Sequence, residues 1–101
     1  MAVIPLSALA ALGTKTVKAS NNSGGGSITV TSTKVSGTSF SEPYASSLTV
    51  DAYGYQANGQ NVVGRASGSG QSVTGSATGV NLTGGFCKAT GNTFGTVYVD
   101  I

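Results

Sequence analysis

The chain has 101 residues, a net charge of +2 and 8% charged residues, against roughly 25% in an average soluble domain. It has no histidine, no tryptophan and one cysteine, so a Ser-His-Asp triad, an imidazole or thiolate metal site and an internal disulfide are excluded. Its 16 glycines, 14 serines and 13 threonines indicate a single small domain rich in hydroxyl groups.

The ionisable residues are few and scattered along the sequence. Nucleic-acid binding usually needs a clustered basic patch, and the five cations are dispersed, so we expect no nucleic-acid partner. With only three carboxylates, Glu42, Asp51 and Asp100, we expect neither a metal site nor a cofactor. Weak self-repulsion favours association with other proteins, which is the first indication of a subunit in an assembly.

An apolar N-terminal arm, 1–13, precedes the rest of the chain. Leu6, Leu9 and Leu12 recur at three-residue spacing between a proline and a glycine, which predicts a short helix over 6–12. An isolated helix this short is only marginally stable in water, and its leucines therefore need a surface to pack against. No basic residue precedes the apolar run, so we expect no export signal. No stretch reaches the roughly 20 apolar residues of a membrane span.

Alternating β-branched residues and frequent glycines predict a β domain over 14–101. The expected strands are 14–20, 27–36, 47–57, 60–67, 71–76, 79–83, 85–90 and 94–101. Residues 37–44 are expected to be a connection. This spacing favours an all-β fold, an immunoglobulin-like antiparallel β-sandwich of about seven strands, with a small β-barrel as the alternative.

Three local patterns add detail to these strands. Val35 has the opposite parity from Ile28 and Val30, which predicts a bulge or bend near Ser32. The glycine-rich segments 24–26 and 64–70 match no phosphate-binding fingerprint and are predicted to be turns. In the last strand, the expected alternation points Val97, Val99 and Ile101 to one side and Thr96, Tyr98 and Asp100 to the other.

Asn58-Gly59 predicts a β-hairpin between 47–57 and 60–67. A two-residue loop would place Tyr55 opposite Val62, Tyr53 opposite Gly64 and Ala52 opposite Arg65. One face then carries Tyr53, Tyr55, Thr49, Asp51 and Val62, and the other carries Leu48, Val50, Ala52, Val63 and Arg65. Neither face is fully polar, so the sequence leaves open which one is the core.

Tyr53 and Tyr55 are the most informative candidate site residues. They fit three interpretations: a protein–protein interface, ordinary core packing, or a platform on which a sugar stacks. Cys87 is interpreted as a small buried hydrophobe, with a reactive thiol or an intermolecular disulfide as the alternative. Asp51 and Asp100 are interpreted as solvated strand residues rather than as an acid–base pair.

The layout as a whole resembles small accessory structural proteins of tailed-phage virions, such as capsid decoration proteins and head or tail components. The features that carry this resemblance are the Met1 start without an export signal, the apolar arm, the Gly/Ser/Thr-rich β domain and a strand that reaches Ile101. The resemblance implies synthesis in the host cytoplasm, a place in the virion and attachment to a lattice through residues 1–12.

We therefore expect a non-enzymatic structural subunit whose partners are a major capsid or tail protein and further copies of itself, and neither nucleic acid nor a membrane. The expected interface residues are Val3, Ile4, Leu6, Leu9, Leu12, Tyr53 and Tyr55. One alternative is a cell-surface adhesin or carbohydrate-binding module that uses Tyr53, Tyr55 and Asp51. The other is a self-polymerising filament subunit whose arm or final strand completes a neighbour's sheet.

Overall fold

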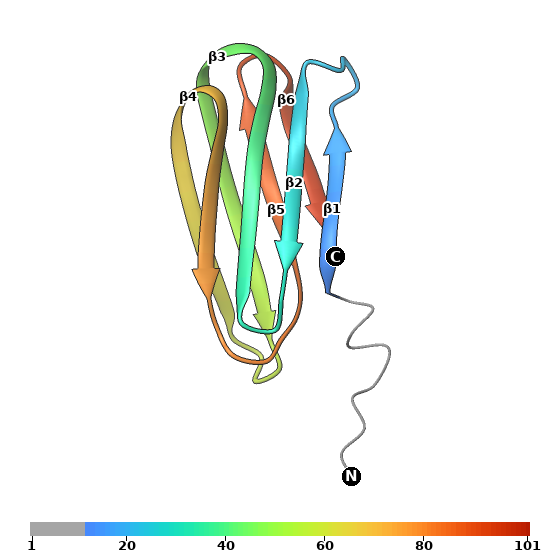
Figure 1. The fold of residues 1–101 in the computed structure, drawn as a ribbon, viewed down its shortest axis with the longest axis vertical. Helices are drawn as coiled ribbons and strands as arrows, with labels where there is room; N and C mark the ends of the chain where they lie inside the picture. Colours follow the sequence, from blue (N-terminus) through green and yellow to red (C-terminus); the bar gives the residue numbers. More distant parts are fainter. Residues whose placement is uncertain (1–11) are drawn as a thin grey trace.

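The computed structural model describes residues 12–101 and shows an all-β protein. Within this part of the chain, six antiparallel strands form one sheet that curls into a half-barrel (Figure 1). The strands are β1 (Gly13–Lys18), β2 (Gly24–Val30), β3 (Lys34–Gln56), β4 (Asn61–Thr78), β5 (Leu82–Gly91) and β6 (Gly95–Asp100). The helix expected over 6–12 lies outside the described residues, except at Leu12, which has no regular secondary structure.

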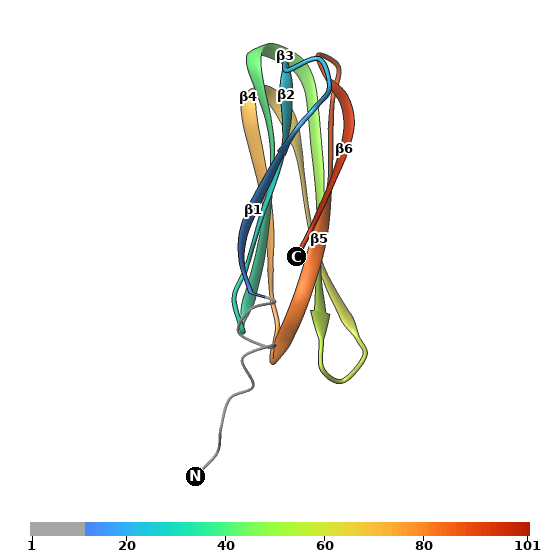
Figure 2. The same cartoon turned by 90° about the vertical axis from the view of Figure 1, so that its right-hand side faces the viewer.

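Two long strands, β3 and β4, run through both walls of the half-barrel. Residues 35–41 of β3 pair with β2, whereas residues 48–56 pair with β5, and β4 pairs with β3 on both sides of the bend. The first wall therefore has the order β1-β2-β3-β4, and the second wall has the order β6-β5-β3-β4. Both long strands arch over the same end of the molecule, and the two walls face each other (Figures 1 and 2).

The continuity of these long strands corrects three expectations. Residues 37–44 are part of β3 rather than a connection, and the segments 60–67 and 71–76 form the single strand β4. The described strands consequently number six instead of about seven. A long bent strand looks like two separate strands in the sequence, because the bend changes which residues point inward. Before the bend the odd-numbered residues of β3 are buried, and after it the even-numbered ones are.

The core lies between the two walls and consists mainly of small and β-branched side chains. Ile28, Val30 and Val35 come from the first wall, and Leu48 and Val50 from the second. The other buried apolar residues are Ala19, Ala45, Ala52, Leu82, Cys87, Ala89, Phe94, Val97 and Val99. Val97 and Val99 lie on one side of β6 as their alternation predicts, and this side is the buried one, whereas Tyr98 and Asp100 are exposed.

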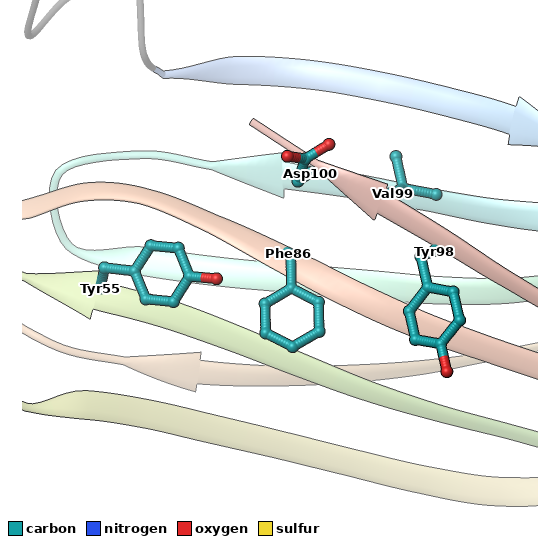
Figure 3. Close-up of a pocket in the computed structure, with 5 residues that line it drawn as sticks. All are labelled: Tyr55, Phe86, Tyr98, Val99 and Asp100. Carbon is teal, nitrogen blue, oxygen red and sulfur yellow. The ribbon is translucent and has the colours of Figure 1, made fainter.

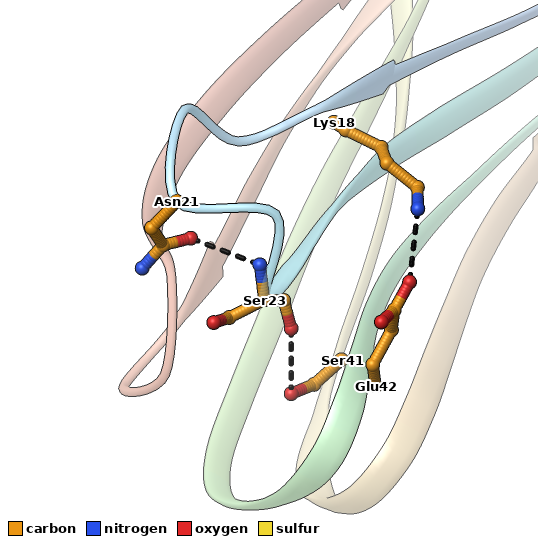
Figure 4. Close-up of polar contacts among 5 residues, drawn as sticks. All are labelled: Lys18, Asn21, Ser23, Ser41 and Glu42. Carbon is orange, nitrogen blue, oxygen red and sulfur yellow. Dashed lines mark hydrogen bonds and ion pairs between the residues drawn. The ribbon is translucent and has the colours of Figure 1, made fainter.

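Polar contacts hold the three loops at the arched end together (Figure 4). The Asn21 side chain accepts a hydrogen bond from the Ser23 amide at 3.0 Å and donates one to the Thr93 carbonyl at 3.1 Å. The Ser41 hydroxyl donates to the Ser23 carbonyl at 3.3 Å and lies 2.7 Å from the Thr93 hydroxyl. These bonds satisfy the buried Ser41 side chain and connect the β1–β2 loop, the bend of β3 and the β5–β6 loop.

An exposed ion pair lies beside this cluster. Lys18 Nζ is 2.9 Å from Glu42 Oε1, and both side chains are more than half exposed (Figure 4). Because water screens such pairs, this one contributes about 0–1 kcal/mol to stability. Substitution of Glu42 is therefore a mild change, suitable as a control.

The β2–β3 connection is a tight hairpin that bends at Ser32 and Thr33, which agrees with the expected bulge or bend near Ser32 but divides the expected strand 27–36 between two strands. Val30 pairs with Val35, and the Thr31 amide donates to the Lys34 carbonyl at 2.8 Å. The Thr31 hydroxyl accepts hydrogen bonds from the amides of Thr33 and Lys34. The segment lacks the Gly, Asn or Pro that usually marks a turn, and the Thr31 side chain supplies the turn's hydrogen bonds instead.

Both glycine-rich segments lie within strands, which corrects their assignment as turns. Residues 24–26 belong to β2 and are buried, and residues 64–70 belong to β4. A side chain on Gly24 would collide with the Phe40 carbonyl and the Phe94 ring, so glycine is required there by close approach.

The β3–β4 hairpin forms as predicted, but its register differs by one residue. The Gln56 amide donates to the Gln60 carbonyl at 3.0 Å, which leaves a three-residue loop with positive φ at Gly59. Tyr55 therefore pairs with Asn61, Tyr53 with Val63, Ala52 with Gly64 and Asp51 with Arg65. A one-residue slip moves every side chain of a strand to the other face. Arg65 and Val63 thus join the tyrosine face, and Leu48, Val50 and Ala52 form the core.

This register predicts different costs for two adjacent valines. Val62 packs against the core, whereas Val63 is 41% exposed. We expect Val62→Ala to lower the free energy of unfolding by about 1–1.5 kcal/mol, because it removes roughly two buried methylene equivalents. Val63→Ala is expected to change it by less than about 0.5 kcal/mol. Urea unfolding of both variants measures this difference, and a larger cost at Val63 would contradict the register.

Candidate functional site

The two outer surfaces of the half-barrel differ in chemistry. On the first wall, cross-strand hydroxyl pairs predominate, such as Thr14 with Thr29 and Thr38 with Thr74, each with oxygens 2.9 Å apart. On the second wall, strands β3 to β6 carry aromatic and charged side chains outward. We call this surface the aromatic face; it consists of Tyr53, Tyr55, Val63, Phe86 and Tyr98, with Asp51, Arg65, Lys88 and Asp100 among them.

Strand pairing brings the rings together. Tyr53 lies opposite Phe86 across β3 and β5, with ring centroids 4.6 Å apart and ring planes 4° from parallel. Tyr55 is tilted by 31° against Phe86 at a centroid distance of 6.2 Å. Tyr98 on β6 is 64% exposed. Aromatic side chains that remain this accessible offer a large contact area with few rotatable bonds.

A pocket of about 290 Å³ opens between these rings. Its lining residues are Tyr55, Phe86, Tyr98, Val99 and Asp100. The three rings lie in a row with Phe86 in the middle, and Asp100 lies to one side of them on β6 (Figure 3). Burial, followed by the negative charge of Asp100, raises the pKa of the Tyr55 hydroxyl. The Asp100 carboxylate is therefore close enough to influence the groups in the pocket.

A second hollow of about 290 Å³ lies farther along the same face, lined by Thr49, Asp51, Arg65, Ala66 and Ser67. Arg65 Nε is 3.3 Å from Asp51 Oδ1. Its interaction with the Tyr53 hydroxyl, followed by the charge of Asp51, raises the pKa of Arg65. The two charges in this hollow thus compensate each other.

The structure excludes one of the three interpretations of Tyr53 and Tyr55. Tyr53 and Tyr55 lie on the outer surface, so the interpretation that their face is the core is wrong. Leu12 is half-buried and packs against the core. The other expected interface residues, Val3, Ile4, Leu6 and Leu9, lie outside the described residues.

Sequence reasoning missed the other three apolar or aromatic members of the aromatic face, namely Val63, Phe86 and Tyr98, and the charged residues Arg65, Lys88 and Asp100. Alternation placed Tyr98 on the side of its strand opposite Val97 and Val99, which was a usable signal. The grouping itself could not be deduced, because it depends on β5 pairing with both β3 and β6.

The carboxylates are distributed rather than clustered. Asp51 lines the second hollow and Asp100 lines the first pocket. Among residues 12–101, no group of three or more His, Cys, Asp or Glu side chains is arranged to hold a metal ion. The same residues include no helix long and apolar enough to span a bilayer.

Cys87 is buried on β5, and its Sγ lies 3.4 Å from the Ser27 carbonyl oxygen. Burial raises the pKa of this thiol to about 11. A thiol that stays protonated and inaccessible is a poor nucleophile. Its environment matches the interpretation of Cys87 as a small buried hydrophobe.

We expect the Cys87 thiol to be unreactive in the folded protein near neutral pH. A disulfide reagent such as dithiobis(nitrobenzoate) should label one thiol per chain in denaturant and none within the same time in native buffer. Because the folded pKa is raised from 9.0 to about 11, the stability linked to this group is complete below pH 9.0 and is lost as the pH rises through about 11. Cys87→Ala should remove this part of the alkaline loss, and rapid native labelling would contradict the assignment.

Comparisons of the chain with models of protein families, with curated proteins and with solved structures find no match.

Proposed function

We propose that this chain is a non-enzymatic structural subunit of a viral particle, which it joins by docking its aromatic face against a neighbouring protein. The observation that carries the proposal is the difference between the two outer surfaces. The first wall presents paired hydroxyls, whereas the second presents Tyr55, Val63 and Tyr98 at 36%, 41% and 64% exposure. Exposed apolar residues that gather on one face are typical of protein-interaction surfaces.

The chemistry of the chain supports a binding role more than a catalytic one. Asp51 is engaged by Arg65, and the single thiol is buried with a raised pKa. A sheet with few ionisable groups is suited to fitting against another surface. The proposed location is the virion, and the proposed partners are a major capsid or tail protein and further copies of the chain. We retain the immunoglobulin-like sandwich as the proposed fold class, since two walls pack over one core.

Co-sedimentation with particles tests the proposal. Purified tagged chain is added to virions prepared from a culture that produces the chain, and the bound fraction is measured after centrifugation. Tyr98→Ser should reduce binding strongly, because Tyr98 is the most exposed ring of the aromatic face. Tyr44→Ser is the matched control, since Tyr44 is 69% exposed but lies at the bend of β3, outside that face.

Three outcomes are informative. Loss of binding in Tyr98→Ser with retention in Tyr44→Ser supports the proposal. Equal binding of both variants, or absence of the chain from particles, overturns it. Polymers formed by the purified chain alone would instead favour the filament subunit, because β1 and β6 each pair with only one neighbouring strand among residues 12–101. The arm is tested by a variant that lacks residues 1–11.

A carbohydrate-binding module is the second candidate, favoured by the pocket in which aromatic rings adjoin a carboxylate. Two observations weaken the version that uses Tyr53 and Asp51. One ring face of Tyr53 is covered by Phe86, and Asp51 is paired with Arg65. A glycan array separates the candidates: binding that is lost in Tyr98→Ser would favour the sugar, and a negative result across the array would count against it.

A further inference from the structure

The first pocket combines two features that attract a cation. Tyr55, Phe86 and Tyr98 provide π-electron density, and aromatic rings attract ammonium and guanidinium groups. Asp100 provides a full negative charge on the same lining. Burial and then the negative charge of Asp100 raise the pKa of Tyr55, which agrees with the presence of both side chains on this lining.

Asp100 is the charged residue that lines the pocket, and no ion pair of the described residues neutralises it. The two ion pairs of the described residues are Lys18 with Glu42 and Arg65 with Asp51, and neither includes Asp100. Lys88 lies on the same face, where strand pairing places it beside Asp51 and Tyr98, and it does not line the pocket. The residues that line the pocket therefore include one carboxylate and no cationic side chain.

Size and shape narrow the choice of ligand. A volume of about 290 Å³ is at the lower limit for pockets that hold a drug-sized molecule, so one side chain suits it better. A planar guanidinium stacks on aromatic rings and can donate two hydrogen bonds to one carboxylate, whereas an ammonium offers only a point charge. The row of rings flanked by Asp100 presents both partners that a guanidinium uses (Figure 3).

We propose that the pocket formed by Tyr55, Phe86, Tyr98 and Asp100 receives an arginine side chain of the partner protein. This inference rests on the proposed function, because it names the chemistry by which the aromatic face recognises its neighbour. The arginine stacks against the rings and pairs with the Asp100 carboxylate.

The test uses short peptides and the isotope-labelled full chain. Acetyl-Gly-Arg-Gly-amide, its citrulline analogue and its lysine analogue are titrated while the amide signals of the protein are followed by NMR. Citrulline keeps the shape of arginine but carries no charge. We expect the arginine peptide to shift signals from residues 84–86 and 98–100, and the citrulline peptide to bind about fivefold or more weakly, as expected for loss of a solvent-exposed charge pair.

Two variants define the site. Asp100→Asn should weaken the arginine peptide about fivefold and remove most of the salt dependence of binding. Glu42→Gln is the matched control, because it removes a carboxylate at the arched end, away from the pocket. Equal binding of arginine and citrulline peptides, no effect of Asp100→Asn, or no shifts at all would overturn the inference.

Failure of this inference can be distinguished from failure of the proposed function. If Asp100→Asn co-sediments with particles as well as the unsubstituted chain does, and the arginine peptide does not bind, the arginine site is wrong while the structural role stands. If the peptide binds and the chain never associates with particles, the arginine site stands and the virion role is wrong. Shifts of the same signals by chitotriose with none by arginine would assign the pocket to a sugar.

Discussion

Gly64→Ala is expected to lower the free energy of unfolding by about 3 kcal/mol or more, at or above the upper end for added volume in a packed core. A Cβ at this position would collide with the carbonyl of Ser76 and lie 2.7 Å from its amide nitrogen. Both groups are backbone atoms of the returning half of β4, so no side-chain rotation relieves the collision. The two halves of β4 would have to separate, which opens one side of the half-barrel.

Gly68→Ala is the matched control in the same strand. Its Cβ would meet only the Val73 Cγ1, at 3.2 Å, and a valine methyl can give way. Because alanine also restricts the unfolded chain, a change within about 1 kcal/mol of zero is expected. Chemical denaturation of both variants measures the difference. If Gly64→Ala were as stable as Gly68→Ala, the close approach of the two halves of β4 would be wrong.

Leu48→Ala is expected to cost about 2–5 kcal/mol of stability, because it empties a fully buried site at the point where β3 enters the second wall. The Leu48 side chain lies against Gly91, whose glycine leaves room for it: a Cβ there would be 2.8 Å from Leu48 Cδ2. Since typical domains are stable by only about 5–15 kcal/mol, such a loss is a large share of the total.

Thr49→Ala provides the control for this substitution. Thr49 is the next residue on β3 but points outward and is exposed, so its truncation should change stability by less than about 0.5 kcal/mol. Thermal unfolding of both variants is the measurement. A larger loss for Thr49→Ala than for Leu48→Ala would mean that the tyrosine face of β3, rather than the Leu48 face, is the core.

Several features of this protein were determined by the sequence alone. Period-two alternation with frequent β-branched residues predicted an all-β fold, and it placed Val97 and Val99 on one side of the last strand with Tyr98 and Asp100 on the other. The Asn58-Gly59 pair located the β3–β4 hairpin. These are properties of neighbouring residues, because backbone preference and side-chain direction within one strand depend on local sterics.

The exact pairing needed the tertiary structure. Asn-Gly is compatible with a two-residue or a three-residue loop. The three-residue loop of the structure exchanges the faces of the two valines, so that Val63 instead of Val62 lies on the tyrosine face. The bend in β3 was likewise hidden, because the change of parity between Ser41 and Leu48 looks like the end of a strand. In the structure, Leu48 and Val50 are buried, and Val62 rather than Val63 packs against the core.

The candidate site shows the same division. Tyr53 and Tyr55 could be selected from one hairpin, since they are two residues apart on one strand. Phe86, Tyr98 and Asp100 join them only because β5 lies between β3 and β6. Pairing between distant segments depends on how all strands pack around one core. The energy of that packing is a property of the whole fold rather than of any local run of residues.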